Sequence, residues 1–263
     1  MEHRLMGGAP APGPLVTVEQ VDGFAVLTLN DPAHRNALSY EMSCAIAEAV
    51  ELVLAADAGA IVLTAAPPVF CAGGNLDDLI APRVPLADTY AGMLALAHAP
   101  VPTIAAVGGA AIGAGVNLPL ACDIIIAGES ASFDPRFLDV GIAPGGGHLW
   151  RLAGRIGTQG AAALVLCGDR LTGAEAARCG LAWRCVPDDE LTAVASRLAR
   201  RAAGRQHDLV ARTKTTLRTT AALADADEAV AAELVVQQWS VDRPGFADHV
   251  RGVRDRLRAA RSA

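Results

Sequence analysis

Two glycine-rich segments of this chain have the residue types and spacing that could do chemistry. They are Phe70–Leu76 and Gly108–Leu118, and each follows a short apolar stretch, residues 60–64 and 103–107. Because small residues leave room at the backbone, a ligand atom can closely approach the N–H groups of such turns. Two turns folded against each other could point one N–H each at a single oxygen, which is an oxyanion hole made of main chain. Either turn alone is also consistent with simple packing in an α/β domain. It is the presence of both turns that indicates an oxyanion hole.

The elements that would position these turns follow from the hydrophobic pattern of the first 150 residues. Ser39 is a plausible N-cap for the first helix, and Asp22-Gly23 is a typical tight turn between two paired strands. Strand–strand–helix units recur along this part of the chain. The predicted strands are Leu15–Val21, Phe24–Asn30, Ile61–Thr64 and Thr103–Val107, and the predicted helices are Ser39–Ala56, a short one after the first glycine turn, and Pro85–Ala99.

The remainder of the chain, from Leu152 onward, is dominated by helical patterns. One short strand is predicted at Ala182–Cys185. The predicted helices are Asp188–Ala203, Asp208–Ala222, Asp225–Ser240 and Gly245–Ala259.

Length and composition set limits on the class of protein. The 263 residues suit one large domain, or one domain with a helical appendage. Hydrophobic residues are 52% and aromatic residues only 4%, so the core must be built mainly from aliphatic side chains. We expect no membrane span, because no run of eighteen apolar residues occurs. The start lacks the apolar region of a signal peptide, and the six scattered cysteines suit free thiols in a reducing compartment, so a cytoplasmic location is expected.

Charge and motif content exclude several functions. The net charge is −6, which argues against nucleic acid as a partner. Residues 1–150 carry −11 and residues 151–263 carry +5. The later arginines are either solvated helix faces or groups that meet an anionic ligand or the acidic part of a neighbouring subunit. Neither a P-loop nor a metal-binding histidine motif occurs, so no metal site is expected.

The order and spacing of several motifs resemble the enoyl-CoA hydratase/isomerase (crotonase) superfamily. The resemblance covers about two-thirds of the chain, and it implies an α/β fold with a crotonase-like ββα spiral core and a C-terminal helical oligomerisation region. It also implies a flexible lead-in at 1–14, the spiral core at 15–170, the helical region at 171–263, and a homotrimer or a hexamer formed as a dimer of trimers. The motifs are Leu29–Leu38, the two glycine segments, Ala121–Ala127, Ala131–Phe133, Val140–Gly147 and Leu166–Thr172.

The same resemblance implies a binding site for an acyl-CoA, with coenzyme A as part of the substrate and no permanently bound cofactor. The oxyanion donors would be the N–H groups of Gly74 and Ala114. Arg35 is the best-placed cation for a phosphate, and Asn75 is expected to cap the following helix. The family's C-terminal contacts to a neighbour's CoA fall on His249 and Gly252, and Arg251 or Arg254 could substitute for them. The residues implied in CoA binding are His34, Arg35, Ala37, Ala72, Gly73, Asn75 and Leu76.

The implied acid/base positions depart from the family pattern. Enoyl-CoA hydratases use two glutamates, and by resemblance these fall on Asn117 and Phe137. Neither side chain can exchange a proton at neutral pH, so the two-glutamate hydration mechanism is not available as such. Asp139 lies two residues past Phe137 and shares its face only if that segment is extended. Further candidates are Asp134, Asp77, Asp78 and His148, for which surface, capping or structural roles are the alternative.

Three functions therefore remain open from the sequence. The first is an acyl-CoA enzyme of the lyase or isomerase class that stabilises a thioester enolate with an altered acid/base set. The second is a catalytically degenerate acyl-CoA-binding protein. The third is a decarboxylase or thioester hydrolase of the same fold, in which the oxyanion hole carries more of the chemistry.

Overall fold

The computed structural model describes residues 13–261, so the lead-in expected at residues 1–14 lies almost wholly outside the described residues. The chain divides into two compact units, Met1–Gly204 and Arg205–Ala263. Residues 171–204, which the resemblance assigns to the C-terminal helical region, lie within the first unit.

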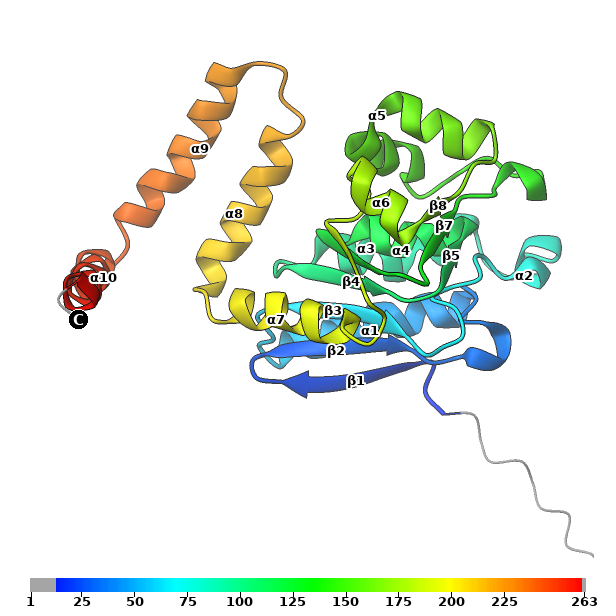
Figure 1. Ribbon diagram of the computed structural model, residues 1–263, viewed down its shortest axis with the longest axis horizontal. Coiled ribbons are helices and arrows are strands. Elements are labelled where there is room, and N and C mark those ends of the chain that lie inside the picture. Colours follow the sequence, from blue (N-terminus) through cyan, green and yellow to red (C-terminus); the bar gives the residue numbers. More distant parts are fainter. Residues whose placement is uncertain (1–12, 262–263) are drawn as a thin grey trace, which may run out of the picture. The chain divides into compact units, whose positions relative to one another are not determined.

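The first unit is organised around a six-stranded sheet with the strand order β1-β2-β3-β4-β6-β9. Figure 1 labels its first four strands, β1 to β4. β1 and β2 pair antiparallel, and every later neighbour is parallel. The predicted tight turn between β1 and β2 is confirmed: Asp22 and Gly23 both have positive φ, 43° and 82°, as a two-residue hairpin turn requires. The strands are β1 (Val16–Val21), β2 (Phe24–Leu29), β3 (Ile61–Ala65), β4 (Thr103–Val107), β6 (Ile124–Gly128) and β9 (Arg184–Val186).

Helices cover both faces of this sheet because its central strands are apolar on both sides. The helices α1 (Tyr40–Ala55) and α3 (Ala91–His98) pack in the larger core cluster with Leu27, Leu63 and Ala105. The helix α7 (Leu191–Ala203) packs in a second cluster with the alternate strand residues Val62, Ile104 and Ile126. Strands buried on two faces read as near-continuous apolar runs, which explains the prediction of β3 and β4. The equally apolar β6 was not predicted as a strand.

A second, three-stranded sheet has the order β5-β7-β8 and was not predicted. Its strands have only two or three residues each, too few to show a period of two. β5 and β7 pair in parallel, which brings the second glycine segment beside residues 132–134. The strands are β5 (Ala110–Ile112), β7 (Ser132–Asp134) and β8 (Leu171–Thr172).

Short helices connect these strands around the glycine segments. The helix predicted over Pro85–Ala99 is instead a 3₁₀ turn, Leu86–Tyr90, followed by α3. A longer helix begins at His148, and it is broken at Gly157, which has φ 73° and ψ 167°. The remaining elements of this unit are the 3₁₀ turns Pro32–His34, Gly113–Val116 and Leu138–Val140, and the helices α2 (Leu76–Ile80), α4 (Asn117–Ala121), α5 (His148–Leu166) and α6 (Gly173–Cys179).

The second unit consists of α8 (His207–Thr220), α9 (Ala226–Val241) and α10 (Phe246–Arg261). The guanidinium groups of Arg212 and Arg243 lie 4.1 and 5.0 Å from the ring centre of Trp239, which ties α8 and the end of α9 together. No residue of α9 is buried within this single chain. No helix within residues 13–261 is both long and apolar enough to cross a membrane.

Candidate active site

The two glycine segments lie directly against each other. Cys71 donates its N–H to the Ala110 carbonyl at 3.0 Å and accepts from the Ile112 N–H at 2.9 Å, so the segments form a short parallel bridge. A Cβ on Gly73, whose φ is 102°, would lie 2.8 Å from the Ile112 oxygen. A Cβ on Gly115 would lie 2.6 Å from the Cys71 oxygen. Glycine is therefore required for the approach of the two turns to each other.

The two expected oxyanion donors, Gly74 and Ala114, are neighbours at this junction. A Cβ built on Gly74 would lie 4.0 Å from the Ala114 Cβ, and one on Gly73 would lie 3.9 Å from the Ala114 nitrogen. The backbone of Leu38 holds the first turn in place through two hydrogen bonds. Its N–H donates to the Gly73 oxygen at 2.7 Å, and its carbonyl accepts from the Asn75 N–H at 3.0 Å. Among the backbone hydrogen bonds of the described residues outside regular elements, none uses the Gly74 or Ala114 N–H.

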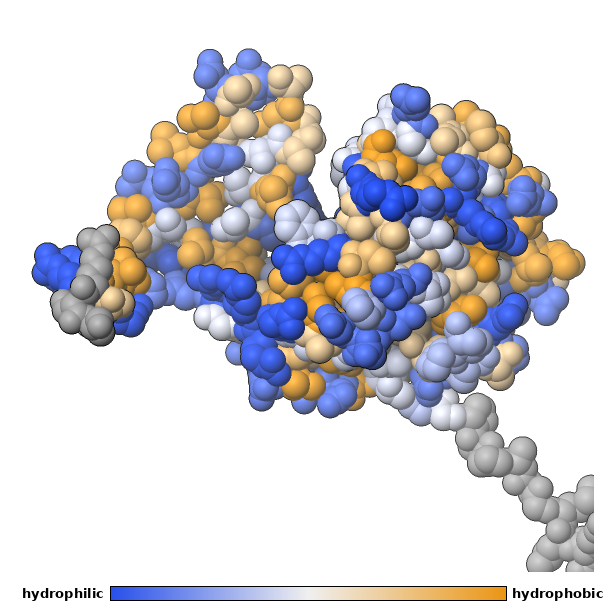
Figure 2. All heavy atoms as spheres, viewed as in Figure 1, coloured by the Kyte–Doolittle hydropathy of each residue, from blue (hydrophilic) through white to orange (hydrophobic). Residues whose placement is uncertain are grey.

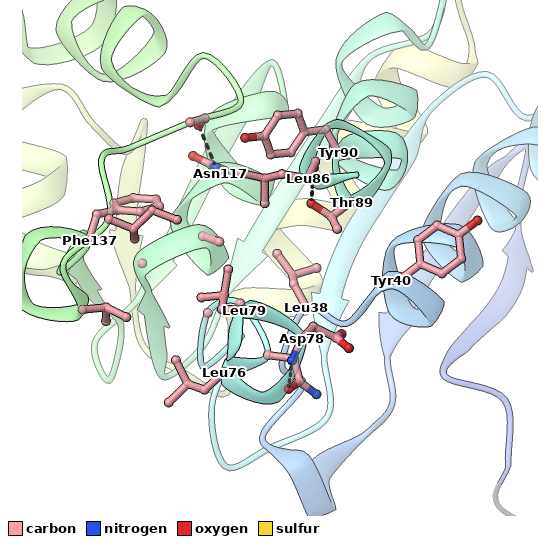
Figure 3. Close-up of a pocket in the computed structure, with 18 of the residues that line it drawn as sticks. Leu38, Tyr40, Leu76, Asp78, Leu79, Leu86, Thr89, Tyr90, Asn117 and Phe137 are labelled. Carbon is pink, nitrogen blue, oxygen red and sulfur yellow. Dashed lines mark hydrogen bonds between the residues drawn. The ribbon is translucent and has the colours of Figure 1, made fainter. Parts of the chain in front are cut away.

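A cavity of about 670 Å³ opens onto this junction, and apolar side chains form much of its wall (Figure 3). This volume is in the range of small-molecule and cofactor sites. The structure places most of the expected site residues in its lining: Arg35, Ala72, Gly73, Gly74, Asn75, Leu76, Ala114, Asn117 and Phe137. Three expected residues, His34, Ala37 and Asp139, are not part of the lining.

The loop that carries Arg35 is held by Asn36, which the sequence reasoning did not single out as structural. Asn36 is fully buried, accepts from the Asp31 N–H at 2.8 Å, and donates to the carbonyls of Ala66 and Val69 at 2.8 and 2.9 Å. Its φ of 52° is a conformation that Asn tolerates better than most residues. Asn36 therefore fixes the Arg35 backbone beside the first glycine segment.

The first glycine segment leads into α2, and its cap is as expected. The Asn75 Oδ1 accepts from the N–H groups of Asp77 and Asp78 at 2.8 and 3.3 Å, which confirms the capping role. Asp78 lines the cavity and is paired with Arg83 at 2.9 Å, and Arg83 also contacts Glu41 at 2.7 Å. The Arg83 guanidinium lowers the pKa of Glu41 to about 2. These carboxylates are therefore held as ion-pair partners.

The cavity lining also contains Asn117, one of the two residues at which the resemblance implies a glutamate in related enzymes. Its Oδ1 lies 2.7 Å from the Nδ1 of His148, and its Nδ2 donates to the Gly145 oxygen at 3.3 Å. The amide oxygen can only accept, so His148 carries its proton on Nδ1. The edge of the Phe137 ring packs against the His148 ring, with centroids 4.9 Å apart. The buried Nε2 of His148 has no hydrogen-bond partner in the structure.

Burial lowers the pKa of His148 to about 4, and this gives the first prediction. Its folded-state pKa lies below its unfolded value of about 6.5, so its contribution to stability is complete above pH 6.5 and is lost as the pH falls toward 4. We expect the free energy of unfolding to fall by about 2 kcal/mol between pH 7.5 and 5 because of this group. Urea unfolding at the two pH values measures this fall in the free energy of unfolding. The part of the fall that His148 causes should be absent from His148→Gln. An equal pH dependence in the variant would contradict the assignment.

Three of the aspartates considered for acid/base roles, Asp77, Asp134 and Asp139, are not part of the cavity lining. Asp139 is exposed on the 3₁₀ turn 138–140, so Phe137 points inward and Asp139 outward. Asp134 is buried and paired with Arg136. Asp77 is exposed and is not part of the cavity lining. None of the three replaces a family glutamate in this geometry.

Tyr90 is a polar residue of the cavity that the sequence reasoning missed. It ends the 3₁₀ turn before α3, lines the cavity, and points its hydroxyl toward the region of Asn117 in Figure 3. A Cβ on Gly145 would lie 2.4 Å from this hydroxyl, so the phenol rests on the Gly145 backbone. The sequence shows only a tyrosine in a helical stretch, and no local signal reveals this contact.

Comparisons with known proteins agree with this architecture. A family model described as "Enoyl-CoA hydratase/isomerase" matches residues 19–243. The chain is 42% identical over 234 residues to a "Probable enoyl-CoA hydratase" of Mycobacterium tuberculosis, covering 85% of this chain and 91% of the relative. It is 37% identical over 188 residues to a 1,2-epoxyphenylacetyl-CoA isomerase of Escherichia coli, covering 68% and 72%. The crystal structure of an enoyl-CoA hydratase from Polaromonas sp. JS666 matches with a TM-score of 0.84 at 27% identity, covering 92% of this chain and 97% of that one.

Proposed function

This chain belongs to the enoyl-CoA hydratase/isomerase family, and from that premise we propose that it is an acyl-CoA enzyme with a backbone oxyanion hole. In this proposal the thioester oxygen accepts hydrogen bonds from the Gly74 and Ala114 N–H groups. The observation that carries the proposal is the adjacency of these two turns at the wall of one cavity. Arg35 and the backbone of residues 72–76 would receive the CoA portion, while His34 and Ala37 lie outside the cavity lining.

The proposed reaction is enolate stabilisation without the family's two-glutamate acid/base pair. When a thioester becomes an enolate, negative charge develops on its oxygen, and one positioned donor is worth about 3–4 kcal/mol there. Asn117 and Phe137 occupy the glutamate positions. Among the described residues that line the cavity, the only carboxylate is Asp78. Its Oδ1 is ion-paired with Arg83, and its buried Oδ2 has no hydrogen-bond partner among those residues.

Because the one carboxylate among these lining residues is in an ion pair, a second candidate function is favoured within the same site. Loss of CO₂ from an acyl group with a free carboxylate gives the thioester enolate without a base, so a decarboxylase would need the two donors and no glutamate. A protein that only binds acyl-CoA would use the same cavity and form no product.

Enolate formation is the decisive test of the proposed function. Acetoacetyl-CoA ionises near neutral pH to an enolate that absorbs in the near ultraviolet, so a site with two donors should increase that absorbance on binding. Incubation with enoyl-, malonyl- and aryl-CoA thioesters, followed by mass spectrometry, then identifies the reaction. Binding without an increase in enolate absorbance would overturn the oxyanion hole, and product from any thioester would exclude a purely binding protein.

We also propose that the chain assembles as a homotrimer or a hexamer through residues after about 170. In α9 the side chains of Val230, Leu234 and Val235 are 62%, 55% and 71% exposed in the single chain. Figure 2 shows hydrophobic residues on the outside of these C-terminal helices. Such an apolar surface commonly marks a protein–protein interface.

This proposal predicts a trimer or hexamer in solution at micromolar concentration. Leu234→Glu should shift the population toward smaller species, because it places a charge in the apolar interface. Light scattering coupled to size-exclusion chromatography measures the molar mass of the wild-type protein and of the variant. Glu228→Gln, at the exposed start of the same helix, is a matched control. A wild-type monomer would contradict the prediction.

A further inference from the structure

We propose that Arg155, a residue outside the cavity lining, is a positioning residue for the oxyanion donor Ala114. It acts through the helical segment 113–121, which consists of the 3₁₀ turn Gly113–Val116 and α4. The inference rests on the proposed function, because it takes the Ala114 N–H as a donor to the thioester oxygen. It adds to that site a residue that no substrate atom is expected to touch.

The segment 113–121 carries the donor near one end and is buried at the other. Ala114 is its second residue, and all five residues of α4, Asn117–Ala121, are buried. The last carbonyls of a helix have no intrahelical partner, and burial removes water as a substitute. A donor from another element is therefore needed to hold this end of the segment.

Arg155 of α5 supplies that donor. Its Nη2 donates to the Cys122 oxygen at 2.6 Å and to the Leu120 oxygen at 3.3 Å. Hydrogen bonds from a charged donor are stronger than neutral ones, and removing such a donor leaves a buried carbonyl unsatisfied. Arg155 therefore fixes the C-terminal end of α4 to α5.

A second contact joins the same two helices at the other end of α4. The His148 Nδ1 lies 2.7 Å from the Oδ1 of Asn117, the first residue of α4. His148 and Arg155 both precede the break at Gly157, and residues seven apart lie on the same face of a helix. One face of α5 thus holds α4 at both ends. Without Arg155, the segment that carries the donor would be free to tilt about the remaining contact.

The charge of Arg155 acts in the same direction as its hydrogen bonds. At about 1.5 Å per residue, the held end of the segment lies roughly 12 Å from Ala114. At that distance and an effective dielectric constant of about 20, a positive charge raises the enolate-to-keto ratio of a bound thioester by about tenfold. The Asp123 carboxylate interacts with the same guanidinium and offsets part of its charge, so we expect about threefold to tenfold.

The test measures the pKa of acetoacetyl-CoA bound to the full-length protein, from the enolate absorbance recorded against pH at saturating ligand. Arg155→Met removes the charge and both hydrogen bonds while keeping a long side chain. We expect it to lower the enolate-to-keto ratio by about threefold to tenfold, which raises the pKa of the bound ligand by about 0.5 to 1. Arg155→Lys keeps the charge, so its ratio should be higher than that of Arg155→Met.

Val165→Ala is the matched control for a general loss of stability. Val165 is buried on the same helix, ten residues after Arg155, and lies outside both glycine segments. Its truncation leaves a cavity, which lowers stability, but it should leave the pKa of bound acetoacetyl-CoA unchanged. Thermal unfolding shows whether each variant is folded at the temperature of the titration. Should Arg155→Met fail to fold, Arg155→Gln takes its place, because it is also uncharged but keeps an amide donor for one carbonyl.

The outcomes separate this inference from the proposed function. A wild-type protein that binds acetoacetyl-CoA without an increase in its enolate would overturn the proposed function. A wild-type increase that persists unchanged in the folded, uncharged variant would overturn only the role of Arg155. An equal loss in Val165→Ala, or a ratio in Arg155→Lys no higher than in the uncharged variant, would also overturn that role.

Discussion

Crotonyl-CoA is expected to be hydrated very slowly, if at all, by the purified protein. Removing one positioned acid or base usually costs about 10²–10⁴-fold, and in the proposed site Asn117 and Phe137 stand at both acid/base positions, where neither can exchange a proton. A typical enzyme turns over on the order of 10 s⁻¹, so a loss of at least about 10²-fold gives a crotonyl-CoA hydration rate below about 0.1 s⁻¹. Loss of the conjugated-thioester absorbance measures this rate. Hydration at a typical enzyme rate would show that another group, such as Tyr90, takes over the proton transfers.

The surroundings of the two positions explain why restoring glutamates should recover little activity. In Asn117→Glu with Phe137→Glu, the first carboxylate would meet the Nδ1 of His148, which now bonds Asn117 at 2.7 Å. The second would replace a ring that is only 8% exposed and packs on His148, and burial would raise its pKa so that it stays protonated. Positional errors of about 1 Å can cost a further 10²-fold. A double variant as fast as an ordinary hydratase would mean that the site differs from a hydratase at these two side chains only.

The sequence predicts the scaffold of the site well because the relevant signals are local. The apolar runs of β3 and β4 and the glycines after them identify both turns, and Ser39 and Asn75 cap their helices as expected. Each of these features depends on residues within a few positions of one another. The hydrogen bonds between Cys71 and the second segment link the turns across the fold, and only the structure reveals them.

The parts that were not predicted depend on contacts between distant residues. Nothing around Tyr90 indicates that its hydroxyl meets Gly145, because Gly145 lies on a separate loop. The pattern around Phe137 left two conformations open, and the 3₁₀ turn 138–140 turns Asp139 out to solvent. The helix α7 was predicted as one of a series of helices in the C-terminal part of the chain, yet it packs on the sheet of the first unit. Periodicity defines a helix and its apolar face, but it does not identify the surface that covers that face.

Replacing Ala114 by proline is expected to remove one oxyanion donor while leaving the fold in place. Ala114 is the second residue of a 3₁₀ turn that begins at Gly113, where the N–H is not needed for the first intrahelical bond. Proline is tolerated in the first turn of a helix for that reason. Loss of one positioned donor costs about 10²–10³-fold in turnover, or about 3–4 kcal/mol of transition-state stabilisation. We expect that loss with whichever thioester the wild-type protein converts, together with loss of the enolate absorbance of bound acetoacetyl-CoA.

The matched control is Ala114→Gly, which keeps the N–H and should retain turnover within about threefold, because only the side-chain methyl and backbone freedom change. Since proline also restricts the residue before it, here Gly113, the thermal unfolding of both variants must be compared with that of the wild type. A second measurement needs no variant: the infrared stretching frequency of the thioester carbonyl in the wild-type complex. Two N–H donors should lower this frequency relative to that of the free thioester. A folded Ala114→Pro protein with wild-type turnover and enolate absorbance, or an unshifted carbonyl in the wild-type complex, would place the thioester oxygen away from Gly74 and Ala114.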